Sequence, residues 1–162
     1  MAEKQVSIEL LRVSTVVPAI PTVKRRMFLS NLDLMWIPIN KVQRLLFYKT
    51  SCPDNVFSAL VDMLKRSLSL VLVDFYPLAG RLNIKGEEQS GRPEVECNDA
   101  GVEFIEASID MAFQDMENED FQYKSFFKKL TPTHDAHYTC NHESYHAPLL
   151  SIQVLKTLLV LN

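Results

Sequence analysis

Apolar residues recur every three or four positions between residues 51 and 75, and this spacing predicts one long amphipathic helix. The apolar stripe consists of Phe57, Leu60, Val61, Leu64, Leu68, Val71, Leu72 and Phe75. Ser51 and Asp54 stand three residues apart where the stripe begins, which is typical of a capping box. Pro77 follows the stripe and predicts the end of the helix. We expect the stripe to face the protein core.

Shorter segments, some of them alternating between polar and apolar residues and others mostly apolar, predict β-strands. The segments are Val6–Val13, Arg44–Thr50, Pro93–Cys97, Val102–Ala107 and Leu149–Val154. The turn-forming residues Asn98–Gly101 between the third and fourth segments predict a hairpin. A polar, histidine-rich stretch over Thr131–Ala147 predicts irregular structure. Several strands with one long helix between them favour an α+β fold, with a mixed β-sheet and helical cover.

Composition narrows the classes of function. A chain of 162 residues fits one domain, and its net charge of −3 gives no sign of a nucleic-acid partner or a membrane partner. The three cysteines are scattered, which favours a reducing compartment over a disulfide framework. No segment approaches the roughly 20 apolar residues of a membrane span, and the first residues lack the apolar core of a signal peptide. We therefore expect a cytoplasmic protein.

The four histidines and one cysteine fall in one segment, which raises the question of a metal site. They are His134, His137, Cys140, His142 and His146. Imidazole and thiolate are good zinc ligands, but their spacing matches no standard zinc finger. His142 and His146 would share a face of a helix, and the nearby Pro148 argues against a helix there. We expect a surface loop and no metal, with zinc binding as the open alternative.

Four short segments, taken in order, carry a family resemblance. They are Leu29–Asp33 (LSNLD), Phe75–Leu82 (FYPLAGRL), Glu96–Phe104 (ECNDAGVEF) and Pro148–Val154 (PLLSIQV). Together they resemble the N-terminal part of the plant BAHD acyltransferases of secondary metabolism, the HXXXD-type enzymes that move an acyl group from coenzyme A to an alcohol or amine. The resemblance implies a truncated chloramphenicol-acetyltransferase-like domain over residues 1–154, whereas residues 155–162 form a tail unlike the family.

The catalytic motif of that family is missing. No histidine of the chain is followed four places later by an aspartate, and the Asp-Phe-Gly-Trp-Gly signature does not occur. The family's histidine acts as general base on the acceptor. The resemblance therefore implies that this chain holds no catalytic residue and is inactive alone, which leaves open whether it is an enzyme. The alternative is a non-enzymatic truncated paralogue, a binding or interaction module that associates through an exposed sheet edge.

The resemblance also implies where substrates would bind. In the family, the segment around residues 40–48 helps to line the acceptor side of the channel, so Asn40, Arg44 and Leu46 are the candidate substrate-binding residues. Acyl-CoA would be a co-substrate and a small molecule the acyl acceptor, with no further cofactor. Asp33 and Arg81 belong to the family's motifs, and we expect them to serve in capping or structural pairing instead of catalysis.

Overall fold

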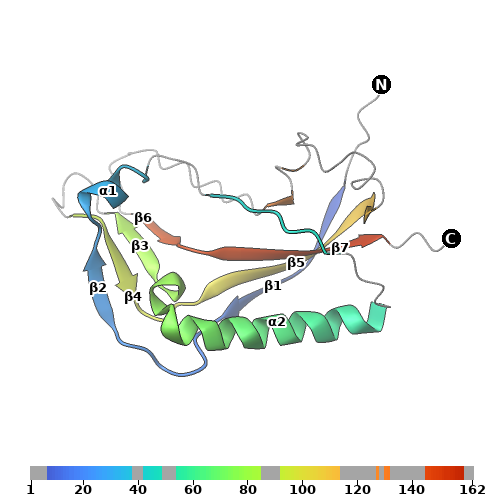
Figure 1. The fold of residues 1–162 in the computed structure, drawn as a ribbon, viewed down its shortest axis with the longest axis horizontal. Helices are drawn as coiled ribbons and strands as arrows, with labels where there is room; N and C mark the ends of the chain where they lie inside the picture. Colours follow the sequence, from blue (N-terminus) through green and yellow to red (C-terminus); the bar gives the residue numbers. More distant parts are fainter. Residues whose placement is uncertain are drawn as a thin grey trace.

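Two β-sheets and one long helix make up the fold of the computed structural model (Figure 1), and the predicted α+β class is confirmed. The structure describes residues 7–37, 42–48, 54–84, 92–113, 127, 130–131 and 145–158. The first sheet contains β1 (Ile8–Val16), β5 (Val102–Ala112) and β7 (Ser151–Leu158) in the order β1-β5-β7. It is mixed, because β1 is antiparallel to β5 and β7 is parallel to it.

The second sheet has four strands, all antiparallel, in the order β2-β4-β3-β6. They are β2 (Arg25–Phe28), β3 (Arg81–Ile84), β4 (Glu94–Cys97) and β6 (Tyr145–Pro148). The strands therefore divide between two sheets instead of forming one. Part of the stretch predicted to be irregular, from Tyr145 on, is strand β6, because it pairs with β3.

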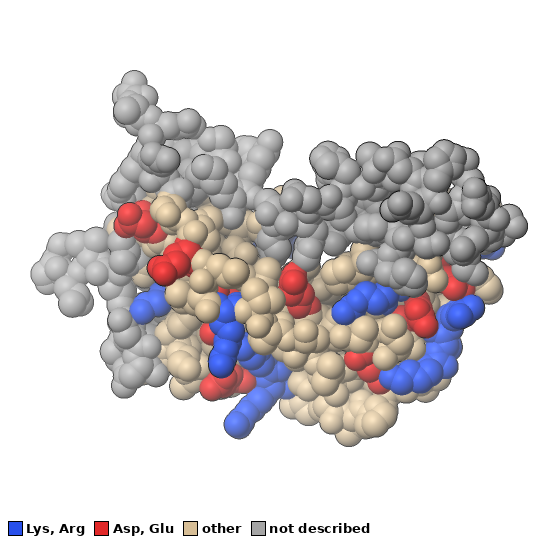
Figure 2. Space-filling view, turned by 180° about the vertical axis from the view of Figure 1, so that it is seen from behind, with Lys and Arg blue, Asp and Glu red and all other residues tan. Residues whose placement is uncertain are grey.

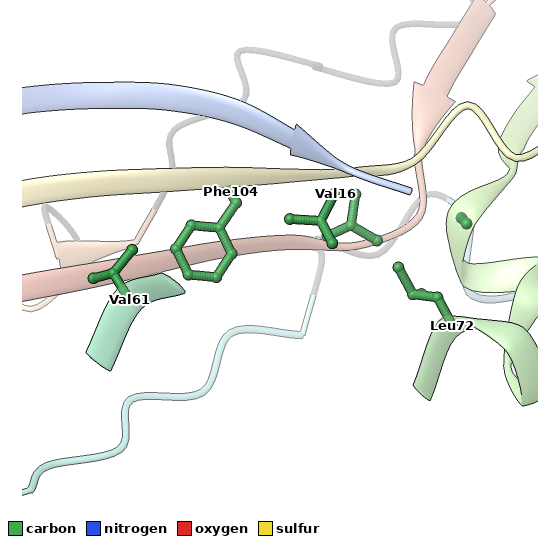
Figure 3. Close-up of a cluster of buried hydrophobic side chains, with 6 residues drawn as sticks. Val16, Val61, Leu72 and Phe104 are labelled. Atoms are coloured by element: carbon green, nitrogen blue, oxygen red, sulfur yellow. The ribbon is translucent and has the colours of Figure 1, made fainter. Parts of the chain in front are cut away.

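The predicted helix is confirmed as α2 (Asp54–Asp74), and a 3-10 turn, η1 (Tyr76–Ala79), follows it. Val61 and Leu72 point from α2 towards Phe104 and Val16 of the first sheet (Figure 3), and at most 7% of any of the four remains exposed. Burying a side chain of this size stabilises the fold by roughly 1.5–3 kcal/mol. The helix is therefore held mainly by this contact.

Only part of the predicted apolar stripe faces the core. The exposed fractions of Leu64, Val71 and Phe75 are 40%, 51% and 59%. These three side chains of the stripe therefore remain accessible to solvent. The predicted cap cannot be compared, since Ser51 and the Asp54 side chain lie outside what the structure describes.

The hairpin predicted across Asn98–Gly101 is wrong. Among the described strands, β4 pairs with β2 and β3, whereas β5 pairs with β1 and β7. Asp99 and Gly101 have left-handed backbone angles, with φ of 53° and 88°. The Gly101 N–H donates to the Ala79 carbonyl oxygen, 2.8 Å away. This bond holds the turn against η1, so the chain passes from one sheet to the other instead of folding back on itself.

The surface carries both signs of charge. On the face seen in Figure 2, acidic and basic side chains are interspersed over the described residues, and neither sign forms a continuous field. This mixture agrees with the small net charge of −3. Within the described ranges, no helix has both the length and the apolar content needed to cross a membrane.

Candidate functional site

The segment of residues 42–48 holds two of the three predicted substrate-binding residues. The predicted strand is wrong for residues 44–48, which lie outside both sheets. The predicted alternation is nevertheless present, because Leu45 and Phe47 are half-buried whereas Arg44 and Leu46 are exposed. Asn40 lies outside the described residues. Contact of these residues with a substrate stays a prediction.

Two apolar side chains anchor the segment. Leu45 and Phe47 pack against a buried cluster formed by Ile109, Met111, Phe127 and Leu130. The rings of Phe47 and Phe127 are 5.9 Å apart between centroids and are tilted by 52°, a favourable aromatic geometry. The anchors fix the direction of the neighbouring side chains, so Arg44 and the 73%-exposed Leu46 point away from the cluster. The segment thus presents a cation and an apolar group to any ligand on that side.

Asp33 serves as a helix cap, as the sequence predicted. It belongs to the short helix α1 (Asn31–Leu34), which begins after Ser30. The Ser30 N–H donates to Asp33 Oδ2 at 2.8 Å, and the Asp33 N–H donates to Ser30 Oγ at 3.2 Å. These two bonds lower the pKa of the Asp33 carboxyl. The Leu29 N–H donates to the carbonyl oxygen of Pro93 at 3.1 Å, which ties this motif to the chain just before β4.

Arg81 pairs with backbone carbonyls, also as expected. Its guanidinium donates to the carbonyl oxygens of Gly80, Gly101 and Ala100, at 2.9, 2.7 and 3.2 Å. Gly80 itself lies close to the strand beside it, since a Cβ at that position would be 2.5 Å from the Glu96 carbonyl oxygen. The FYPLAGRL and ECNDAGVEF motifs therefore meet at one joint. Their contacts there are structural.

Asp99 closes the same joint from the other side. Its carboxylate accepts hydrogen bonds from the Thr22 N–H at 3.0 Å, from Thr22 Oγ1 at 2.5 Å and from Lys24 Nζ. Burial raises the pKa of Asp99, but the bonds from Lys24 and Thr22 outweigh that effect and the pKa is lowered to about 2. The loop between β1 and β2 is thereby tied to the turn between β4 and β5.

An ion pair joins the long helix to the first sheet. Lys65 Nζ of α2 lies 2.5 Å from Glu106 Oε1 of β5, and the two side chains are 18% and 14% exposed. The same ammonium group lies 5.1 Å from the centroid of the Phe104 ring. Charge pairing and the aromatic face both favour the ammonium at this position. Sequence patterns did not indicate this pair, because the two residues are 41 positions apart.

The described residues contain no catalytic constellation that we can identify. No three His, Cys, Asp or Glu side chains come together there as metal ligands. The Cys97 thiol is buried, and desolvation raises its pKa, which disfavours the reactive thiolate. His134, His137, Cys140 and His142 lie outside the described residues, and only the backbone of His146 is described. The expected surface loop without metal and the alternative of zinc binding by these residues both stay predictions.

One open cavity of about 420 Å³ lies between the loop after β1 and the end of α2. Its lining residues are Pro21, Thr22, Val23, Val73 and Tyr76. Neither Arg44 nor Leu46 lines it. The cavity is mostly apolar, and the sequence patterns did not indicate it, because its walls come from an irregular loop and a helix end.

Comparison with known proteins finds similar sequences along most of the chain. The model of the Transferase family matches residues 6–157. The chain is 35% identical, over 149 residues, to a shikimate O-hydroxycinnamoyltransferase from Nicotiana tabacum, covering 92% of this chain and 32% of that protein. It is 38% identical over 144 residues to a hydroxycinnamoyl-CoA:5-hydroxyanthranilate N-hydroxycinnamoyltransferase from Avena sativa, covering 87% of this chain and 30% of the relative. This chain thus spans about a third of the length of these relatives.

Among solved structures, the crystal structure of vinorine synthase is similar, with a TM-score of 0.49 and 22% sequence identity. The likeness covers 93% of this chain and 35% of that one.

Proposed function

We propose, on the premise that this chain belongs to the Transferase family of plant BAHD acyltransferases, that its 162 residues supply scaffold and acceptor-side wall for acyl transfer from acyl-CoA but no catalytic base. One observation carries the proposal. The family match runs over residues 6–157 of a sequence in which no histidine is followed four places later by an aspartate.

The physical argument concerns the proton of the acceptor. A hydroxyl or amine must lose a proton as it attacks the thioester carbonyl, and a positioned base speeds this step by roughly 10²–10⁴-fold. The proposal therefore makes this chain inactive by itself.

The acceptor-side wall in this proposal is the segment that Leu45 and Phe47 anchor. Arg44 and Leu46 are exposed on its outer side, and Asn40 completes the proposed set. The exposed guanidinium of Arg44 suits an acceptor that carries a carboxylate, since the two groups form charge-assisted hydrogen bonds. The names of the relatives favour a hydroxycinnamoyl donor and a small alcohol or amine acceptor. The proposal keeps the cytoplasmic location.

A direct assay tests the proposal. The purified chain is incubated with a hydroxycinnamoyl-CoA and, in turn, with shikimate, 5-hydroxyanthranilate and putrescine, and ester or amide products are measured by chromatography. We expect no product above the buffer blank. Product formed in proportion to the concentration of the chain would refute the proposal.

A second candidate function, association with a protein partner or a second copy, is favoured by strand β1. Among the strands that the structure describes, β1 lies at the edge of its sheet. Its residues Leu10, Leu11 and Val13 are 62%, 51% and 51% exposed, and exposed apolar edges favour pairing. Light scattering after size exclusion tests this candidate. Under it, the chain is a dimer or larger and Leu11→Lys returns it to a monomer, whereas a monomeric wild-type chain argues against self-association.

A further inference from the structure

Two buried oxygen atoms belong to residues that face each other on neighbouring strands of the second sheet. Asn83 of β3 and Glu94 of β4 are directly opposite each other in the antiparallel register. Glu94 is 2% exposed, and Asn83 Oδ1 and Glu94 Oε1 are both buried. Neither atom accepts a hydrogen bond from any residue that the structure describes. Opposed residues have Cβ atoms about 4.5–5.5 Å apart, so the two side chains are neighbours on one face of the sheet.

Such a pair of acceptors is costly. A buried acceptor without a donor destabilises a protein, and a buried carboxylate without a donor destabilises it more. Arg26 Nε lies 3.7 Å from Glu94 Oε1, which is an ion pair but too long for a hydrogen bond. The Arg26 side chain is 63% exposed, so it covers the carboxylate from the solvent side. Arg26 offsets the charge of Glu94 without donating to either oxygen.

The register of the second sheet adds an aromatic residue to this row. Phe28 of β2 is directly opposite Glu94 on its other side, so both residues lie on the same face of the sheet. Phe28 is 66% exposed. The face of an aromatic ring attracts cations. The row across the sheet is therefore aromatic, carboxylate and amide, in that order.

We propose that the row of Phe28, Glu94 and Asn83 binds a primary ammonium group. An ammonium has three N–H donors, which suits one carboxylate oxygen, one amide oxygen and one aromatic face. A metal ion such as Mg²⁺ requires about six oxygen ligands, and the described residues bring no three metal-ligating side chains together. The ligand class is thus an alkylamine in its protonated form. This site is separate from acyl transfer and does not depend on it.

Arg26 competes with the ligand in this arrangement. An ammonium bound to Glu94 displaces the guanidinium from the carboxylate, so removing Arg26 strengthens amine binding. Arg25, the preceding residue of β2, is a matched control. Its guanidinium lies 5.5 Å from the centroid of the Tyr76 ring, and Arg25 stands opposite Cys97 instead of Glu94.

The test measures the thermal unfolding midpoint of the chain with methylammonium chloride at constant ionic strength. We expect a saturable rise with methylammonium and none with tetramethylammonium, which has the same charge but no N–H. Glu94→Gln abolishes the rise, and Asp62→Asn, at an exposed position on α2, retains it. Arg26→Ala lowers the half-saturating concentration several-fold, and Arg25→Ala does not.

Three outcomes overturn the proposal. An equal rise with tetramethylammonium shows a non-specific salt effect, and a rise with MgCl₂ alone shows a metal site. No rise in the wild type or in Arg26→Ala shows that the oxygens have their donors already, for example through rotation of the Asn83 amide. Each readout is binding to the folded chain, so failure here leaves the proposed function standing, and failure of the acyl-transfer assay leaves this site standing.

Discussion

Arg81 Nη1 donates a hydrogen bond to the carbonyl oxygen of Gly101, 2.7 Å away, and thereby joins the start of β3 to the turn before β5. The two residues are 20 positions apart and belong to two different family motifs. The bond is part of a set in which the guanidinium also contacts the carbonyls of Gly80 and Ala100. The most recognisable residues of the chain therefore join a strand of the second sheet to the turn that leads into the first sheet.

Arg81→Lys should destabilise the fold by about 2 kcal/mol, because a hydrogen bond from a charged group contributes about 1.5–3 kcal/mol. A lysine has a single donor centre and cannot reproduce the fork that reaches three carbonyls. Urea unfolding followed by circular dichroism measures the loss. Arg66→Lys, at an exposed position of α2, is the control and should change the free energy of unfolding little. Equal stability of the two variants would show that the Arg81 contacts are dispensable.

Gly101→Ala should destabilise the fold by about 1–3 kcal/mol, because its φ of 88° strains any residue with a Cβ. The added Cβ would lie 2.5 Å from Thr15 Cγ2 and 2.9 Å from the Val16 carbonyl oxygen. Thr15→Ser removes the first of these contacts. Thermal unfolding should therefore show that the double variant recovers part of the lost stability but not all of it. Full recovery would mean that the backbone angle costs nothing.

Asp99 should make stability depend on acid pH. Its folded pKa is about 2 against an ordinary value of 3.8, so the folded chain holds the carboxylate charge more strongly than the unfolded chain does. The stabilisation is complete above 3.8 and is lost as the pH falls from 3.8 through about 2. Asp99→Asn should lose this part of the pH dependence in urea unfolding. Asp33→Asn, which removes the other carboxyl with a lowered pKa, should retain it. An unchanged pH profile in Asp99→Asn would contradict the assignment.

Lys65 and Glu106 should show a coupling energy of about 1–3 kcal/mol in a double-mutant cycle with Lys65→Met and Glu106→Gln. Both side chains are under 20% exposed, so solvent screens their interaction weakly. Asp62 and Arg66, four residues apart on the exposed face of the same helix, are the comparison pair, with an expected coupling of about 0.3–0.5 kcal/mol. If high salt reduced the coupling energy of both pairs equally, solvent would screen Lys65 and Glu106 as strongly as the surface pair. That result would contradict the prediction.

The sequence predicted those elements that depend on local pattern. The 3.6-residue period placed α2, and alternation placed β1, β4 and β5. The pairing of β4 was not predictable in this way. A turn such as Asn98–Gly101 has the same residues whether or not its flanking strands pair. The course of this turn depends on the hydrogen bond from the Gly101 N–H to the carbonyl oxygen of Ala79, a residue 22 positions earlier in the chain.

The candidate site was predictable only in part. Alternation over residues 44–48 correctly separated Leu45 and Phe47 from Arg44 and Leu46, although the segment is not a strand. No sequence pattern predicted that Phe28, Glu94 and Asn83 form a row. Its members come from three strands, and only the register of the second sheet brings them together.

The most direct test of the central claim compares the rate of acyl transfer of the wild-type chain with that of the variant in which His134, His137, His142 and His146 are all alanine. Each is supplied with a hydroxycinnamoyl-CoA and an acceptor, and product is followed over several chain concentrations. The account predicts that both rates equal the buffer blank, because the chain contains no general base in the required motif. A wild-type rate above the blank that disappears in the histidine-free variant would contradict it.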